Sequence, residues 1–416
     1  MSSRSVQVKV DEQGRLVLPP EVMTALGLVD GATVRVDEEG GAIRIGRSTA
    51  NLGRVYVEPT NTCNLYCRTC VRNVWDEPPG MMSAETFGRV IEGVRSVTPV
   101  PTVFFGGFGE PFAHRDIMDM IATAKATGAE VELITNGTAL DVAASIELTR
   151  LGLDRLWVSL DGATPESYAD VRLRDAFPQV TASLARLREI RIRSGSLVPR
   201  LGIAFVAMRR NIADLPEVIR LGTKLGADRF SISNVLPHTA EMRDQVLYGD
   251  TVYPSDRELF GWMRCVALPR MMIDESTSAA FARLQGVRHL PWPQHDGPGP
   301  APNTCPFVER GSVSIRWDGR VSPCLPLLHT HLGYLDFRPR ISHAHFVGSL
   351  TDRPLLEIWN EPGYVALRER LQAFDFSPCT ECNSCDMADE NLEDCFGSPT
   401  PACGGCLWAQ GFIQCP

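Results

Sequence analysis

Short hydrophobic runs alternate with longer amphipathic segments through the middle of the chain. The runs that read as strands are RVYVEP (54–59), TVFFGG (102–107), EVELIT (130–135), RLWVSL (155–160), RLGIAFVAM (200–208) and RFSISNV (229–235). Segments with a helical period lie between them, for example at 83–97, 114–128 and 176–191. Short β-branched runs separated by helices are typical of parallel strands joined by crossovers, so we expect an α/β fold. Six such units over 52–240 predict a partial (β/α)6 TIM-like barrel with its functional residues at the carboxyl ends of the strands.

Residues 1–48 have a different pattern, in which runs at strand period surround a short helical segment at 21–28. The stretches DEQGRLVLPPEV and LGLVDGATVRV resemble the AbrB-like swapped-hairpin family, in which two chains interlace and which often binds DNA. Residues 1–46 carry five basic and seven acidic residues, a balance that opposes phosphate binding. We therefore expect this small, mainly-β module to serve homodimerisation or docking, and DNA binding is not expected.

The carboxy-terminal third divides into two regions. Residues 241–304 are less periodic, and WPQHDGPGPAPN (292–303) reads as a linker or a covering segment. Residues 305–416 are rich in cysteine and show few regular elements, so we expect this region to depend on metal sites for its order.

Composition and charge narrow the class of protein. The chain has 416 residues, of which 44% are hydrophobic and 22% charged, as in ordinary folded proteins. Its net charge of −9 argues against a dedicated nucleic-acid surface. The sequence shows neither an apolar run that could span a membrane nor a secretory signal, so a cytoplasmic location is expected. Thirteen cysteines are an odd count that fits disulfides poorly, and their clustering is typical of metal coordination.

Three of the cysteines lie on the segment TNTCNLYCRTC, directly after the first predicted strand. Cys63, Cys67 and Cys70 come from one loop, so their thiolates can face a single point. Three thiolates would leave one iron of a four-iron cluster open to another ligand, as a reactive metal centre requires. The spacing alone also allows a structural zinc site or free thiols, but the position after the first strand favours the cluster.

A C-x3-C-x2-C motif after the first strand of such a chain resembles the radical S-adenosylmethionine (SAM) superfamily. The resemblance covers about residues 52–240 and implies that the open iron chelates SAM. It further implies reductive cleavage of SAM to a 5′-deoxyadenosyl radical, which abstracts hydrogen from a substrate. FFGGFGEP (104–111) resembles the glycine-rich motif of the family, with its acidic position displaced to Glu110 by an inserted Phe108–Gly109.

The same resemblance implies SAM contacts at the ends of the strands. It assigns them to Gly106, Gly107, Phe108, Glu110, Asn136, Ser159, Asp161, Arg172, Met208 and Asn211. Ser159 and Asp161 would face the ribose or the carboxylate, and the Arg172 guanidinium would grip the carboxylate through two bonds. Ordinary turns after strands, and a solvated Arg172 on a helix that Thr164 caps, are the alternatives.

The remaining cysteines concentrate near the carboxyl end. Cys305 and Cys324 flank an expected hairpin with its turn at Asp318–Gly319. This pattern resembles the SPASM-type extension, which holds auxiliary four-iron clusters, and implies that these cysteines are ligands together with Cys379, Cys382, Cys385, Cys395, Cys403, Cys406 and Cys415. Nine cysteines exceed by one the eight that two complete clusters take, and their order departs from the usual extension. Their pairing therefore stays open, with two zinc sites as the alternative. Cys265 has no neighbouring cysteine and is expected to be a buried thiol.

Two H-x-H pairs lie between the cysteine groups. His329, His331, His343 and His345 could bind a metal or an anion if extended, because side chains at i and i+2 share a face. We expect exposed loop histidines instead.

These observations predict a radical SAM enzyme with one SAM-binding four-iron cluster and two auxiliary clusters. SPASM-type relatives modify a peptide or protein, or mature another enzyme. The ending CGGCLWAQGFIQCP and the amino-terminal module resemble the maturases of tungsten-containing oxidoreductases. The expected partners are a peptide or protein substrate or a client oxidoreductase, and a reductant such as ferredoxin or flavodoxin; no membrane is expected. The alternatives are an iron–sulfur redox-sensing DNA-binding regulator and a zinc-stabilised scaffold protein.

Overall fold

The central feature of the fold is a row of six parallel strands. A computed structural model describes residues 9–20, 23, 34–39, 42–248, 266–285, 303–335, 337–381 and 385–416. The strands are β5 (Arg54–Val57), β6 (Thr102–Phe105), β7 (Val131–Thr135), β8 (Arg155–Ser159), β9 (Arg200–Ala207) and β10 (Ala227–Asn234). They pair side by side in chain order. The predicted parallel α/β arrangement is confirmed, with each strand within two residues of its expected start and end.

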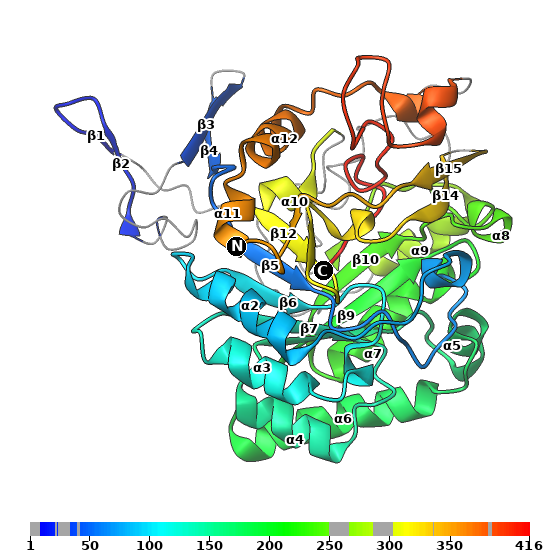
Figure 1. Ribbon diagram of the computed structural model, residues 1–416. Helices are drawn as coiled ribbons and strands as arrows, with labels where there is room; N and C mark the ends of the chain where they lie inside the picture. Colours follow the sequence, from blue (N-terminus) through cyan, green and yellow to red (C-terminus); the bar gives the residue numbers. More distant parts are fainter. Residues whose placement is uncertain are drawn as a thin grey trace.

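Helices that connect these strands cover one face of the sheet (Figure 1). They are α2 (Ala84–Arg95), α3 (Ile117–Lys125), α4 (Val142–Leu151), α5 (Pro165–Arg172), α6 (Phe177–Ser194) and α7 (Leu215–Lys224), with short 3-10 turns η1 (Val71–Val74), η2 (Pro111–Ala113) and η3 (Ile212–Asp214). Side-chain caps mark where several of them begin. Ser83 accepts a bond from the Thr86 amide at 3.0 Å, and Thr164 forms a capping box with Ser167.

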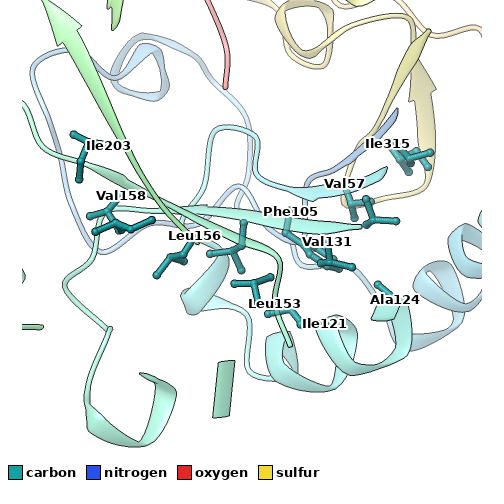
Figure 2. Close-up of a cluster of buried hydrophobic side chains, with 14 of the residues drawn as sticks. Val57, Phe105, Ile121, Ala124, Val131, Leu153, Leu156, Val158, Ile203 and Ile315 are labelled. Carbon is teal, nitrogen blue, oxygen red and sulfur yellow. The ribbon is translucent and has the colours of Figure 1, made fainter. Parts of the chain in front are cut away.

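Alternation along the strands separates two apolar layers, because successive side chains of a strand point to opposite faces. One set faces the helices, and Figure 2 shows Val131 of this set, together with Leu153, next to Ile121 of α3. The other set lies on the inner face and includes Tyr56, Phe104 and Trp157. The inner set packs against Phe307, Leu325 and Leu328 from the cysteine-rich region.

The sheet continues from the barrel strands into the cysteine-rich region. Strand β12 (Ser312–Ile315) pairs in parallel with β5, and β13 (Arg320–Ser322) then turns back against β12. The predicted hairpin at Asp318–Gly319 is therefore present, with Gly319 at a φ of +88°. Strand β16 (Gly348–Ser349) extends this edge, and β11 (Val266–Ala267) pairs with β10 at the other edge to complete ten strands.

Short elements build the rest of the carboxyl half. Within 241–304, expected as a linker or covering segment, the structure has α8 (Ala240–Arg243), β11 and α9 (Glu275–Gln285), and α9 packs against α7 and η3. The cysteine-rich region holds α10 (Pro306–Glu309), η5 (Leu325–Leu327), the hairpin of β14 (His331–Leu335) with β15 (Arg338–Ser342), α11 (Leu355–Trp359), α12 (Pro362–Ala373), η6 (Cys379–Glu381) and η7 (Asp386–Asp389). Across the described ranges, no helix has both the length and the apolar character of a membrane span.

Two antiparallel hairpins form the described part of the amino-terminal region. Strand β1 (Lys9–Val10) pairs with β2 (Leu16–Val17), and β3 (Val34–Glu39) pairs with β4 (Ala42–Arg47). The helix predicted at 21–28 lies, apart from Met23, outside the described residues, so the swapped-hairpin architecture stays a prediction. The chain after β4 is fastened to α11, since the Trp359 indole donates to the Ala50 carbonyl at 2.8 Å.

Candidate functional site

The three-cysteine loop lies between β5 and η1, at the carboxyl end of the first barrel strand. Cys67 is buried, whereas Cys63 and Cys70 are partly exposed. The Leu65 amide donates to Cys63 Sγ at 3.4 Å, and the Cys70 amide donates to the Cys67 carbonyl at 3.0 Å. Burial raises the pKa of the Cys70 thiol to about 11, and the nearby Cys67 and Cys63 add to that shift. The thiols thus influence one another electrostatically, and a bound cation would displace their protons.

Two arginines near this loop have guanidinium N–H groups without a hydrogen-bond partner among the described residues. Arg172 Nη1 lies 3.7 Å from Cys67 Sγ, and Arg172 Nη2 pairs with Asp161 Oδ2 at 2.5 Å. Burial lowers the pKa of Arg172, but attraction to Asp161 and Cys67 outweighs it, so the net pKa is raised. Arg172 Nε, Arg72 Nε and Arg72 Nη1 are buried without a hydrogen-bond partner among the described residues. Unpaired guanidinium donors beside three thiols fit a negatively charged group, such as a thiolate-bound cluster with a carboxylate ligand.

The glycine-rich loop after β6 rests on the segment that carries the cysteines. Gly107 has a φ of +122°, and a Cβ atom there would lie 2.8 Å from Glu58 Cγ. A Cβ atom on Gly109 would lie 2.0 Å from the carbonyl oxygen of Thr60. Glycine is therefore required at both positions, because no side chain fits between the two loops.

Glu110 and Asn136 join the ends of β6 and β7 to the cysteine loop. The buried Glu110 carboxylate accepts bonds from the Thr135 hydroxyl and the Asn136 amide, both at 2.7 Å. Burial raises the pKa of Glu110 in spite of these bonds. The Asn136 side-chain amide donates to Asn64 Oδ1 at 2.8 Å and lies 3.8 Å from Cys63 Sγ. The structure thus brings these two predicted residues together beside Cys63, with both Glu110 oxygens already in use.

Asp161 and Asn211 link the ends of β8 and β9. Asp161 Oδ1 accepts from the Val206 amide at 2.7 Å, and the Asn211 side-chain amide donates to the Asp161 carbonyl at 3.0 Å. The Met208 amide donates to Asn211 Oδ1 at 2.8 Å, and the Met208 side chain is fully buried. Ser159 is the last residue of β8 and is partly exposed. All four predicted residues therefore lie at the carboxyl ends of the strands, where the cysteine loop also lies. Their contacts with SAM stay a prediction.

Four cysteines of the carboxyl region line one cavity of about 70 Å³. Cys305 precedes α10, Cys324 follows β13, and Cys403 and Cys406 come from the final segment of the chain. Burial raises the pKa of Cys305 to about 12 and the pKa values of Cys324 and Cys403 well above their usual range. Four half-buried cysteines around one largely apolar cavity fit a fully ligated four-iron cluster.

The other described cysteines of this region do not line that cavity. Cys379 is buried with its sulfur 3.1 Å from the Ser377 hydroxyl, Cys395 is exposed, and Cys415 accepts from the Trp408 indole at 3.3 Å. Cys385 is partly exposed, and Cys265 and Cys382 lie outside the described residues. Within the described ranges, no three Cys, His, Asp or Glu side chains are placed to hold a single metal ion.

Comparison with known families decides between the remaining interpretations. Residues 57–222 match the radical SAM superfamily, and residues 305–386 match SPASM, an iron–sulfur cluster-binding domain. The chain therefore contains a radical SAM domain followed by a SPASM domain. The first match contains the three-cysteine loop and the strand ends around it. The SPASM match contains Cys305 and Cys324 but ends before Cys403 and Cys406, which complete the cavity.

Similarity to individual proteins extends over most of this radical SAM enzyme. It is 29% identical over 368 residues to the tungsten-containing aldehyde ferredoxin oxidoreductase cofactor-modifying protein of Pyrococcus furiosus, covering 87% of this chain and 96% of that protein. It is 27% identical over 346 residues to PqqA peptide cyclase of Gluconobacter oxydans, covering 81% and 84%. Streptococcus suis SuiB bound to S-adenosylmethionine shares the fold, with a TM-score of 0.52 at 16% identity, covering 83% of this chain and 73% of SuiB.

The expectation that the SPASM histidines are exposed is wrong for His329 and His331. Both are buried, because the segment after η5 packs on residues of the barrel loops, with the His329 ring against Trp75 and Phe108. His329 Nε2 lies 2.9 Å from Glu58 Oε1, and His329 Nδ1 lies 2.7 Å from Glu77 Oε2. Sequence reasoning singled out neither glutamate. The available signal was the position of Glu58 directly after a barrel strand, where functional residues gather.

Replacing Gly109 with alanine tests the contact between the two loops. Because the new Cβ would overlap the Thr60 carbonyl, we expect Gly109→Ala to cost roughly 1–3 kcal/mol of stability. We also expect less iron at the three-cysteine loop after anaerobic reconstitution. Thermal unfolding and iron analysis provide the measurements. Gly88→Ala is the control, since a Cβ there meets no atom within 4 Å in the middle of α2. Equal thermal stability and equal iron content in the two variants would contradict the contact between the loops.

Proposed function

We propose that this enzyme holds a four-iron cluster on Cys63, Cys67 and Cys70, binds SAM at the open iron, and uses the resulting radical to modify the cofactor or the protein of a client oxidoreductase. The three-cysteine loop within the radical SAM match carries the first part of this proposal. The similarity over nearly the whole length of the Pyrococcus furiosus protein supports the second part. The DNA-binding regulator and the zinc scaffold gain no such support.

The roles of the surrounding residues follow from their chemistry. When bound, the cluster supplies the electron that cleaves the sulfonium of SAM. The backbone of Gly106, Gly107 and Phe108 directly follows β6 and suits the methionine end of SAM. The unpaired donors of Arg72 and Arg172 suit its carboxylate, and Asp161 keeps Arg172 turned toward Cys67. Ser159, partly exposed at the end of β8, suits a ribose hydroxyl.

We assign Cys305, Cys324, Cys403 and Cys406 to one auxiliary cluster. Their shared buried cavity supports this grouping, and four thiolates leave no open iron. The cysteines that remain for a second auxiliary cluster are Cys379, Cys382, Cys385, Cys395 and Cys415. One more cysteine than a cluster takes is therefore available to the second site.

The proposed partners and location follow from the similarity to the Pyrococcus furiosus protein and from the proposed cluster chemistry. The client is a tungsten-containing oxidoreductase, in line with the name of the Pyrococcus furiosus relative. Reductive cleavage of SAM takes a one-electron donor, such as ferredoxin or flavodoxin. The amino-terminal hairpins dock the client or a second copy of the chain. Oxygen-sensitive clusters and reduced thiols agree with a cytoplasmic location.

Modification of a peptide is the second candidate function. The similarity to PqqA peptide cyclase over 81% of this chain supports it. In that case the substrate would be a short peptide instead of a folded enzyme.

Cleavage of SAM tests the reaction itself. Anaerobically reconstituted enzyme with SAM and dithionite is expected to release 5′-deoxyadenosine, measured by liquid chromatography. Cys63→Ala, Cys67→Ala and Cys70→Ala should each abolish this product, because each removes a ligand of the cluster that carries the open iron. Cys265→Ala, which removes a cysteine outside the proposed ligands, should retain it. Undiminished turnover by all three ligand variants would refute the proposal.

Iron content tests the auxiliary grouping. A Cys403→Ala/Cys406→Ala double variant should lose about four iron atoms per chain, because it removes half the ligands of one four-iron cluster. Its paramagnetic resonance signal should still change when SAM is added, since the first cluster is untouched. A double variant with the iron content of the wild type would rule out this grouping.

The identity of the client is tested by deleting the gene for this enzyme in the organism that encodes it. The cofactor extracted from its tungsten oxidoreductase should differ in mass between wild-type cells and cells that lack this enzyme, and oxidoreductase activity should fall in the latter. An identical cofactor in both strains would favour the peptide-modifying alternative.

A further inference from the structure

A buried carboxylate–histidine pair joins the SPASM domain to the glycine-rich loop. Glu58 directly follows β5, and His329 follows η5, five residues after Cys324. Both side chains are fully buried. His329 Nε2 lies 2.9 Å from Glu58 Oε1 and 3.0 Å from Glu58 Oε2. A carboxylate buried in this way needs a charged or hydrogen-bonding partner, and a side chain from the SPASM domain supplies it.

Glu58 in turn supports the loop that we assign to SAM. The Phe108 amide donates to Glu58 Oε2 at 3.2 Å. A Cβ atom on Gly107 would lie 2.9 Å from the same oxygen, so the loop backbone passes directly over the carboxylate. The position of the Gly107–Phe108 peptide therefore depends on where Glu58 is held.

The second nitrogen of His329 is also held. Its Nδ1 lies 2.7 Å from Glu77 Oε2, and the same oxygen pairs with Arg316 Nη2 at 2.5 Å. Each ring nitrogen of His329 therefore faces a carboxylate oxygen. Arg316 Nε also lies 3.8 Å from Asp318 Oδ2, so the histidine belongs to a network of paired polar groups. Such pairing allows polar groups to remain in the protein interior.

Aromatic rings enclose the histidine. The Trp75 ring centroid lies 4.3 Å from that of His329, and the Phe108 ring meets His329 edge-on at 5.5 Å. Trp75 follows the three-cysteine loop, whereas Phe108 belongs to the glycine-rich loop. Parts of both barrel loops therefore pack on a single SPASM side chain, which holds its ring in one orientation.

We propose that His329 is a positioning residue for SAM. It holds Glu58, and Glu58 holds the Gly107–Phe108 peptide at the distance that SAM requires. This inference rests on the proposed assignment of the glycine-rich loop to SAM. It makes SAM affinity depend on a residue of the SPASM domain that lies outside the barrel. Without the docked SPASM domain, Glu58 would lose the His329 partner and keep the Phe108 amide.

Two substitutions of His329 separate its two hydrogen bonds. The side-chain amide of glutamine reaches the position of Nε2 and can still donate to Glu58, whereas that of asparagine reaches only the position of Nδ1 and can donate to Glu77. SAM affinity is measured by equilibrium dialysis on the anaerobically reconstituted full chain, together with iron content. We expect His329→Asn to weaken SAM binding about tenfold, and His329→Gln to weaken it clearly less.

His343→Ala is the matched control. It removes another histidine–glutamate contact of the same region, the 3.2 Å pair between His343 and Glu390, away from the glycine-rich loop. SAM affinity should not change in this variant. Paramagnetic resonance spectra of the reduced enzyme before and after SAM addition provide a second measurement, in which His329→Asn should show a smaller SAM-induced change than His329→Gln.

The outcomes separate this inference from the proposed function. If His329→Asn binds SAM as tightly as His329→Gln, with equal iron content, the positioning role is overturned. Tighter binding by the asparagine variant would overturn it as well. If the wild-type cluster does not respond to SAM at all, the proposed function fails first.

Discussion

Strand β5 is hydrogen-bonded along both of its edges, and the arrangement of the whole molecule depends on this pairing. One edge pairs with β6 of the barrel and the other with β12 of the cysteine-rich region, both in parallel. Because β12 lies between Cys305 and Cys324, its register places the four-cysteine cavity against the inner face of the barrel. The carboxyl end of β5 leads directly into Glu58 and the three-cysteine loop. One strand therefore sets the positions of the three-cysteine loop and the four-cysteine cavity relative to each other.

The inner face of the sheet is packed with apolar side chains, whereas polar side chains gather at the carboxyl ends of its strands. Tyr56, Phe104 and Trp157 pack against apolar residues of the SPASM domain. Nearby, Glu132 accepts from Arg54 at 3.0 Å and from the Trp157 indole at 2.9 Å, so these buried polar groups are paired. This part of the inner face is therefore filled by packed side chains. The polar side chains at the carboxyl ends of the strands are then the groups left to hold a cofactor.

Loops from three parts of the chain meet at the Glu58–His329 pair. Phe108 comes from the glycine-rich loop, Glu77 from the chain after the three cysteines, and Arg316 from the turn between β12 and β13. Loss of one of these side chains removes a hydrogen-bond or ion-pair partner from its buried neighbours. The SPASM domain is thus part of the wall of the radical SAM site as well as a carrier of cysteines.

The sequence by itself determined the six barrel strands, the hairpin at Asp318–Gly319 and the loop that carries Cys63, Cys67 and Cys70. These features depend on local signals, since strand period, turn residues and cysteine spacing are all read within a few neighbouring positions. Only the tertiary structure decided that β12 pairs with β5, that Cys403 and Cys406 share a cavity with Cys305 and Cys324, and that His329 is buried against Glu58. Each of these contacts joins residues at least 79 positions apart, and the last joins residues 271 positions apart. Nothing in the local pattern around His329 marks it as buried, because its burial depends on charges and rings that distant segments bring to it.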